Sequence, residues 1–256
     1  MSYNPKTVIW NDQWQLPEFI GKQRVLIVGP ASPSTGGIPS YIDNLLSSQL
    51  KEQFLLGLLD PLVVKKRFHK QESHFSLNEV KSGLRVLKAF FSTMRKLNPA
   101  LVHIHTSSYW GFYEKAILLA VARTIFRKKI ILHIHGGEFD LFYQKALCKG
   151  FIDRIILWAN KTLIVSRKIK NELGFTEMTQ VDNCVSFNDV ILTTKKELLR
   201  KKYGIPNGKL VFLSVALLQE RKGIYKTLKI FKDILAVRND FVFIIAGEGP
   251  QKEKIT

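Results

Sequence analysis

The sequence predicts an α/β fold in which parallel sheets are covered by helices on both faces. Short β-branched runs alternate with stretches of helical length from residue 23 onward, a pattern typical of parallel sheets. The alternation loosens at residues 191–209 and then restarts. Apolar residues make up 46% of the 256 residues and charged residues 23%, which is enough to bury a core. We therefore predict a complete doubly wound domain at 23–190, a linker at 191–209 and an incomplete second domain at 210–256.

The N-terminal part of the chain carries most of the predicted elements. Residues 1–22 are polar and aromatic and are predicted to form an irregular arm. Apolar runs predict buried strands at 24–29, 54–59, 101–104, 129–134 and 162–165. Amphipathic stretches predict helices at 38–50, 76–97, 112–126 and, as two pieces, 139–160. Ser76 and Glu79 have the spacing of a capping box, and Ser166 is a suitable N-cap for a further helix.

The part after the linker repeats the same alternation but is short. It predicts a strand at 210–215, a helix at 224–237 and a strand at 241–246, followed by a glycine-rich turn. About fifty residues follow the linker, whereas a doubly wound domain needs on the order of a hundred. We therefore expect a truncated second domain that exposes a sheet edge and apolar surface.

The charge of the chain indicates anionic partners. Lysine and arginine number 39 and aspartate and glutamate 21, which gives a formal charge of +18. Nucleotides, phospholipid headgroups, lipid diphosphates and nucleic acid all carry the matching charge. Helix-turn-helix, zinc-finger and aromatic RNA-binding signatures are absent from the sequence, so we expect no nucleic acid partner.

The cellular location follows from the cysteines and the apolar runs. Cys148 and Cys184 are the only cysteines and form no framework, so we interpret them as reduced thiols in the cytoplasm. The N-terminus lacks the pattern of a signal peptide, and the apolar runs are too short to span a bilayer. We expect a cytoplasmic protein whose basic surface can hold it against the inner face of an anionic membrane.

Ligands of parallel sheets bind beyond the carboxyl ends of the strands, and two segments there come from the first half of the chain. Gly36 and Gly37 precede a helix, where backbone N–H groups and the helix dipole favour an anion; a plain strand-to-helix turn is the alternative. His103 and His105 alternate on one predicted strand and therefore share a face. A zinc pair is one interpretation, but carboxylate and thiolate ligands are missing nearby, so we expect no metal. The other interpretation is one satisfied buried histidine and one that reaches a cleft.

Two further segments carry ionisable groups after predicted strands. His135 ends a strand before a glycine turn and could meet a sugar hydroxyl or a phosphate. Glu138 and Asp140 follow it, either as acid–base groups or as caps of the next helix. Arg221 and Lys222 stand at the mouth of a strand–loop–helix unit. Together with the glycine turn that contains Gly247 and Glu248, the lysine suggests binding of a diphosphate.

These motifs, in this order, resemble the family-4 glycosyltransferases. The resemblance rests on Gly36-Gly37, His135-Gly136, Ser166, Lys222-Gly223 and Gly247-x-Gly-Pro250, and it covers roughly residues 24–256. It implies the GT-B fold of two facing Rossmann-like domains, here cut short within the C-terminal, nucleotide-sugar-binding domain. It also implies sugar transfer from a nucleotide-diphosphate sugar with retention of anomeric configuration and without a metal cofactor.

The resemblance assigns roles to particular residues. Gly36 and Gly37 would line the cleft near the donor phosphates, and His135 would contact the transferring sugar. Lys222 would neutralise the diphosphate leaving group, while Gly247 and Glu248 would stand near the nucleotide. His105, Glu138 and Asp140 remain candidates on the acceptor side.

Two departures from the family pattern keep an alternative open. Leu217 stands where the family usually has a phosphate-binding arginine, and Arg221 is the nearby candidate to replace it. The family's pair of glutamates would lie beyond residue 256. The first hypothesis is a glycosyltransferase of cell-surface polysaccharide assembly that acts on a lipid-linked saccharide. The alternative is a non-catalytic truncated product, or an acceptor-binding subunit that needs a separate donor-binding chain.

Overall fold

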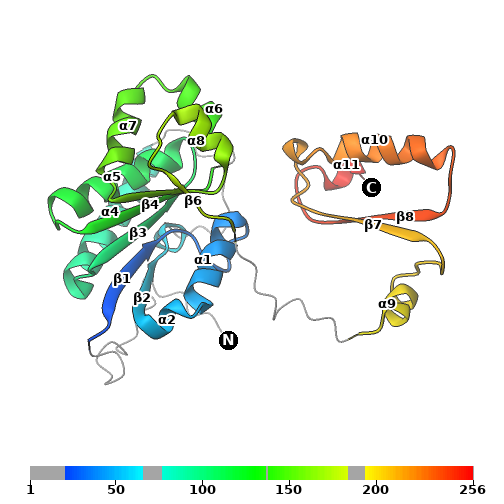
Figure 1. Cartoon of the computed structure of the whole chain (residues 1–256), viewed down its shortest axis with the longest axis horizontal. Helices are drawn as coiled ribbons and strands as arrows, with labels where there is room; N and C mark the ends of the chain where they lie inside the picture. Colours follow the sequence, from blue (N-terminus) through cyan, green and yellow to red (C-terminus); the bar gives the residue numbers. More distant parts are fainter. Residues whose placement is uncertain (1–20, 66–76, 137, 184–193, 256) are drawn as a thin grey trace. The chain divides into compact units, whose positions relative to one another are not determined.

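The structure is a computed structural model that describes residues 21–65, 77–136, 138–183 and 194–255. The chain divides into two compact units, an N-terminal unit of residues 1–186 and a C-terminal unit of residues 187–256 (Figure 1). Residues 1–20 of the predicted arm, the capping residue Ser76, Gly137 and Cys184 lie outside the described residues.

The N-terminal unit is built on a sheet of six parallel strands in the order β2-β1-β3-β4-β5-β6. The strands are β1 (Gln23–Val28), β2 (Phe54–Leu59), β3 (Leu101–Thr106), β4 (Lys129–Ile134), β5 (Lys161–Ile164) and β6 (Thr179–Gln180). The five longer strands confirm the predicted ones to within one or two residues, and the two-residue β6 was not predicted. The strand order reverses between β1 and β3, so this is the switch point at which a doubly wound sheet opens a crevice.

The helices of this unit follow the predicted alternation. They are α1 (Gly37–Ser47), α2 (Leu50–Gln53), α3 (Pro61–Val64), α4 (Leu77–Leu97), α5 (Trp110–Thr124), α6 (Phe139–Lys145), α7 (Lys149–Trp158) and α8 (Arg167–Leu173). The short α2 and α3 were not predicted as helices of their own. Ser166 caps α8 as expected, since its hydroxyl accepts a hydrogen bond from the backbone N–H of Lys168.

The core lies on both faces of the six-stranded sheet. The larger cluster joins alternate residues of β3 and β4, such as Ile104 and Leu132, to buried side chains of α4 and α5, such as Phe90 and Phe112. The smaller cluster packs Ile27 and Leu58 against Ile42 of α1. In Figure 1, α1 accordingly lies on the side of the sheet away from α4 and α5.

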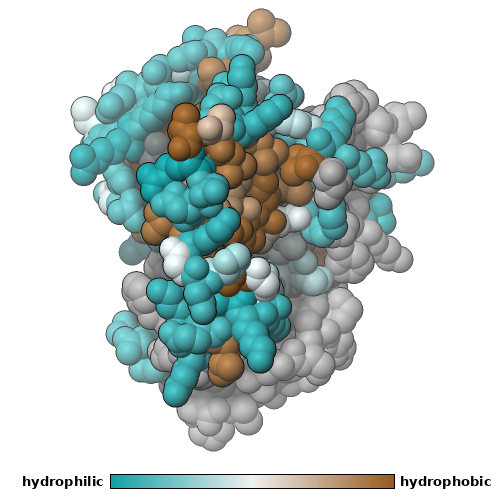
Figure 2. Space-filling model, turned by 90° about the vertical axis from the view of Figure 1, so that its right-hand side faces the viewer, coloured by the Kyte–Doolittle hydropathy of each residue, from teal (hydrophilic) through white to brown (hydrophobic). Residues whose placement is uncertain are grey.

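The C-terminal unit contains a two-stranded parallel sheet and one long helix. Its elements are α9 (Lys196–Lys202), β7 (Leu210–Val215), the 3-10 turn η4 (Glu220–Lys222), α10 (Ile224–Leu235), β8 (Phe241–Ala246) and α11 (Lys252–Ile255). Phe231 of α10 packs against the sheet, with its ring 4.1 Å from that of Phe243 and 5.1 Å from that of Phe212. Leu213 and Val215 stay 62% and 73% exposed. Apolar side chains accordingly gather on the surface in Figure 2.

No described helix has the length and hydropathy that crossing a bilayer requires.

Candidate functional site

The candidate site lies at the carboxyl ends of β1 and β3, where the strand order reverses. Gly29 follows β1 directly and brings the chain close to its neighbours. A Cβ atom at this position would lie 2.5 Å from the side chain of Ile42 and 3.0 Å from Cβ of His105. Only glycine therefore fits between α1 and the end of β3 without displacing one of them.

One buried and one half-buried carboxylate hold the loop between β1 and α1 in place. Asp60, at the end of β2, accepts a hydrogen bond from the backbone N–H of Ala31 at 2.9 Å and also caps α3. Burial raises the pKa of the Asp60 carboxyl, and these N–H groups work against that rise. Asp43 of α1 accepts from the hydroxyl of Ser32 at 2.8 Å. The loop is therefore anchored from two sides before it reaches the helix.

The predicted glycine pair stands at the exposed start of α1. Gly36 is the N-cap residue and has a φ of 139°, a conformation that side chains rarely adopt. Gly37 opens the helix and has open space where a Cβ would be. Both glycines are exposed. The N-terminal backbone N–H groups of an 11-residue helix are thus accessible to an anion at the switch point.

Four histidines lie together on the α1 face of the sheet. His103 and His105 come from β3, His133 comes from β4, and His135 follows β4 directly. The two strands pair in a register that sets His105 beside His133. The shared face of His103 and His105 is confirmed, with ring centroids 4.2 Å apart, and the rings of His133 and His135 are 4.0 Å apart.

The predicted residues His105 and His135 are in direct contact. Nδ1 of His105 lies 2.9 Å from Nε2 of His135, so one imidazole donates a hydrogen bond to the other. The ring of Tyr41, from α1, lies 5.6 Å from that of His105 and 5.0 Å from that of His135. His135 is half-buried, whereas His105 is only 1% exposed. His135 is therefore the member of this pair with access to a ligand.

The histidines of the cluster are uncharged at neutral pH. Burial lowers the pKa of His103 to about 3, of His133 to about 2 and of His135 to about 4. Burial and the neighbouring imidazoles also hold the pKa of His105 well below its usual value. The expectation of one satisfied buried histidine and one cleft histidine on β3 was wrong. Both are buried, and within the described part of the chain Nε2 of each has no hydrogen-bond partner.

Glu138 and Asp140 differ in what surrounds them. Glu138 is exposed at the start of α6 and makes no side-chain hydrogen bond as its N-cap. Asp140 is buried and forms an ion pair of 2.6 Å with Lys168 of α8. The hydrogen bond from Lys168 lowers the pKa of Asp140. The structure thus gives Asp140 a packing partner between α6 and α8 and leaves Glu138 open to solvent.

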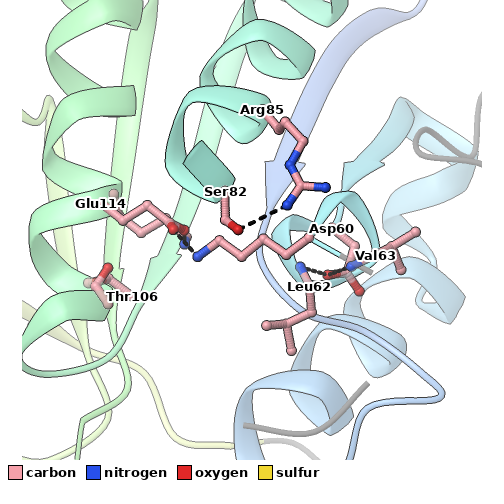
Figure 3. A network of polar contacts seen from close by, with 10 residues as sticks. Asp60, Leu62, Val63, Ser82, Arg85, Thr106 and Glu114 are labelled. Atoms are coloured by element: carbon pink, nitrogen blue, oxygen red, sulfur yellow. Dashed lines mark hydrogen bonds and ion pairs between the residues drawn. The ribbon is translucent and has the colours of Figure 1, made fainter. Parts of the chain in front are cut away.

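A third buried carboxylate, Glu114, lies near the same end of the sheet. Glu114 of α5 is paired with Lys65 and Lys115, and all three side chains are less than a tenth exposed. Burial raises the pKa of Glu114, but the two ammonium groups outweigh it and leave the pKa lowered. Figure 3 shows this group between Thr106, at the end of β3, and the Asp60 turn. The sequence analysis did not find it, because Lys65 and Glu114 are far apart in the chain.

The remaining candidates lie in the C-terminal unit. Lys222 is exposed at the end of η4, after β7, and the side chain of Arg221 lies outside the described part. A Cβ on Gly247 would lie 1.9 Å from the carbonyl oxygen of Ala216. This glycine therefore lets the turns after β7 and β8 touch, and the backbone N–H of Leu218 donates to the carbonyl of Glu248 at 2.8 Å. The carboxylate of Glu248 is exposed and pairs with Lys252 at 2.7 Å.

The match to a known protein family lies in the C-terminal unit. Residues 195–256 match the family model described as "Glycosyl transferases group 1". The chain is 30% identical over 149 residues to the O-antigen biosynthesis glycosyltransferase WclY of Escherichia coli. The aligned region covers 54% of this chain and 41% of that protein. It is 26% identical over 182 residues to TuaC of Bacillus subtilis, a protein named for teichuronic acid biosynthesis. This aligned region covers 67% of this chain and 44% of that protein. The matched stretches thus span less than half the length of these relatives.

Solved structures show the same fold. The crystal structure of HepE from Anabaena in complex with UDP-glucose superposes with a TM-score of 0.59 at 13% identity. The superposition covers 91% of this chain and 62% of that one. The expected α/β fold of GT-B type is therefore confirmed.

Proposed function

We propose that this chain belongs to a glycosyltransferase that moves a sugar from a nucleotide-diphosphate sugar to a saccharide acceptor in cell-surface polysaccharide assembly. The observation that carries the proposal is the family match over residues 195–256, which include Lys222 and the Gly247-Glu248 turn. The names of two relatives, one for O-antigen and one for teichuronic acid biosynthesis, support the polysaccharide context. The UDP-glucose complex of HepE supports a nucleotide-sugar donor.

In this proposal, Lys222 neutralises the leaving group. Departure of a nucleoside diphosphate builds negative charge on phosphate oxygens, and a preorganised cation stabilises that charge in the transition state. The ammonium of Lys222 is exposed after β7, on the carboxyl side of the strand. The lysine takes the place of a divalent cation on the diphosphate, and transfer proceeds with retention. Arg221 and Glu248 complete the donor side.

The N-terminal unit carries further residues that this proposal uses. The open start of α1 at Gly36 and Gly37 offers N–H groups to an anionic part of the donor or acceptor. His135 is half-buried and uncharged, so it can exchange a hydrogen bond with a sugar hydroxyl without adding charge. The contact with His105 orients its ring. The exposed Glu138 is the acid–base candidate nearest in sequence, whereas Asp140 is held by Lys168.

The acceptor in this proposal is a lipid-linked saccharide at the inner face of the membrane. The support is the formal charge of +18, because a basic residue near an anionic membrane surface contributes about 1 kcal/mol of attraction. Weaker binding to anionic vesicles than to neutral ones would contradict this location.

The test is nucleotide-sugar turnover by the native-length gene product with and without the lysine. Lys222→Ala should reduce turnover of the preferred donor by about 10- to 100-fold, since a charge-assisted contact is worth about 1.5–3 kcal/mol. Lys232→Ala is the matched control, because Lys232 is an exposed lysine in the last turn of α10. Equal turnover in all three proteins across a panel of donors would contradict the role of Lys222.

A further inference from the structure

Three buried histidines of β3 and β4 form a cluster, of which the proposed sugar transfer uses only the contact of His105 with His135. Nitrogen atoms of His103, His105 and His133 all lie within 4.8 Å of one another. The three residues are 8%, 1% and 0% exposed. They come from two neighbouring strands and lie on one face of the sheet, so the backbone hydrogen bonds of β3 and β4 fix their spacing.

The unpaired ring nitrogens point to a missing partner. Four buried nitrogen atoms of these three rings lack a hydrogen bond within the described part of the chain. They are His103 Nε2, His105 Nε2, and both Nδ1 and Nε2 of His133. Buried polar atoms are normally satisfied in a folded protein, and these ring nitrogens do not satisfy one another. A ligand that accepts several nitrogen lone pairs at once would remove the deficit.

We propose that His103, His105 and His133 bind one divalent transition-metal ion of the zinc class. Three imidazole nitrogens are a ligand set that suits Zn²⁺, and Co²⁺, Ni²⁺ or Cu²⁺ as its substitutes. Tetrahedral Zn²⁺ with bonds of about 2.0–2.1 Å holds its nitrogens roughly 3.4 Å apart, so the nitrogens close in by at most about 1.4 Å on binding.

The contact between His105 and His135 supplies the outer support that metal-binding histidines commonly have. His105 uses Nδ1 toward Nε2 of His135, at 2.9 Å, and its buried Nε2 has no hydrogen-bond partner in the described part of the chain. Such an outer hydrogen bond fixes both the tautomer and the ring orientation of a metal ligand. The ion would therefore link β3 to β4 at the carboxyl edge of the sheet and, through His105, fix the position of His135. The inference does not depend on the proposed transferase activity.

Sequence reasoning expected no metal because it weighed His103 and His105 alone. The third ligand, His133, comes from the neighbouring strand. The signal was present in the sequence, since His-Ile-His occurs at 103–105 and again at 133–135, each at the end of a predicted strand.

The test titrates the full chain, stripped with a chelator, with Zn²⁺ alone and with Co²⁺ alone. We expect one ion per chain, a rise of the melting temperature with Zn²⁺, and the intense visible absorption of Co²⁺ in a low-coordinate nitrogen site. In the same sample, ¹⁵N spectra of the histidine rings should show shifts at three imidazoles on addition of Zn²⁺. No bound ion above the level of a histidine-free protein would overturn the proposal.

Variants then identify the ligands. His133→Asn and His103→Gln should each weaken Co²⁺ binding more than about 100-fold and remove the visible spectrum. His135→Asn should weaken binding by about 10- to 100-fold and keep the spectrum, because it removes only the outer partner. The double variant His69→Asn, His74→Asn is the matched control, since it removes the other two histidines of the chain and should bind unchanged.

The opposite pattern refutes the site. Binding that is lost in the control and kept in His103→Gln would place the ion outside the cluster. If His133→Asn fails to fold, His103→Gln and the ring spectra of the unaltered protein decide the question, because neither requires that substitution.

Discussion

Strands of similar composition meet different surroundings in the two units. Leu26 of β1 is fully buried in the N-terminal unit, whereas Leu213 and Val215 of β7 are 62% and 73% exposed. Both strands are short, apolar and paired in parallel. The difference lies in what covers them, since β1 has neighbours on both sides and helices on both faces, while β7 pairs with β8 and packs on α10 through Phe212. An apolar run therefore predicts a strand but does not determine how deeply the strand is buried.

The polar groups differ between the units in the same way. The histidine cluster of the N-terminal unit has three buried members and the half-buried His135. The same unit buries the Glu114 carboxylate together with its two lysines. In the C-terminal unit the described ion pairs, Arg238–Asp240 and Lys252–Glu248, are exposed. Ionisable groups of the first unit are thus coupled to its stability, and those of the second are largely screened by water.

Mild acid should produce the largest difference between the units. His103, His133 and His135 titrate near pH 6.5 in the unfolded chain but only at about pH 2 to 4 in the folded one, so between these values the unfolded state binds more protons. The histidines therefore make their full contribution to the free energy of unfolding above about pH 6.5. As the pH drops below that value, this free energy falls by up to about 1.4 kcal/mol per pH unit for each imidazole. Hydrogen exchange of a chelated sample at pH 7.5 and pH 5.0 should show β3 and β4 losing protection.

The C-terminal unit is the internal control for this prediction, because residues 187–256 contain no histidine. Amides of β7 and β8, corrected for the intrinsic exchange rate, should change little over the same pH range. Equal loss of protection in both units would mean that the histidine cluster does not cause the acid sensitivity.

Truncation of core side chains should give the next largest difference. Phe90 of α4 is completely buried, so Phe90→Ala should lower the free energy of unfolding of the N-terminal unit by about 3–5 kcal/mol. Val215→Ala should change stability by no more than about 0.5 kcal/mol, because Val215 is mostly exposed already. Urea unfolding followed by circular dichroism measures both. A large loss in Val215→Ala would show that β7 is covered in solution.

The sequence was sufficient for the regular elements of the fold and for single site residues. Alternating apolar runs and helix-length stretches identified the five longer strands of the first sheet, because their pattern is local. His105 and His135 were found because they end strands. What the sequence analysis missed depends on contacts between distant segments. Tyr41 joins the cluster only through the packing of α1, and His133 joins it through the register of β3 with β4.

The Asp60 turn is a second example of a contact between distant segments that the sequence analysis missed. Its position after β2 is visible in the sequence, but its hydrogen bond to Ala31 depends on the pairing of β1 with β2. In the C-terminal unit, Gly247 was expected to stand near a nucleotide. The structure supplies a separate reason for glycine there, namely the approach of the Ala216 carbonyl. Residue type alone does not distinguish a glycine needed for packing from one needed for binding.

Removal of one carboxylate charge from each unit should give the smallest contrast of the three. Glu114→Gln leaves Lys65 and Lys115 buried without their counter-charge, which should cost about 3 kcal/mol at neutral pH. Asp240→Asn breaks an exposed pair with Arg238 and should leave stability unchanged within error. Urea unfolding at pH 7.5 measures both, and the Glu114→Gln, Lys65→Met double variant should recover part of the loss. If Glu114→Gln proved neutral, the buried group would be solvated in practice, and the contrast in ionisable groups between the two units would disappear.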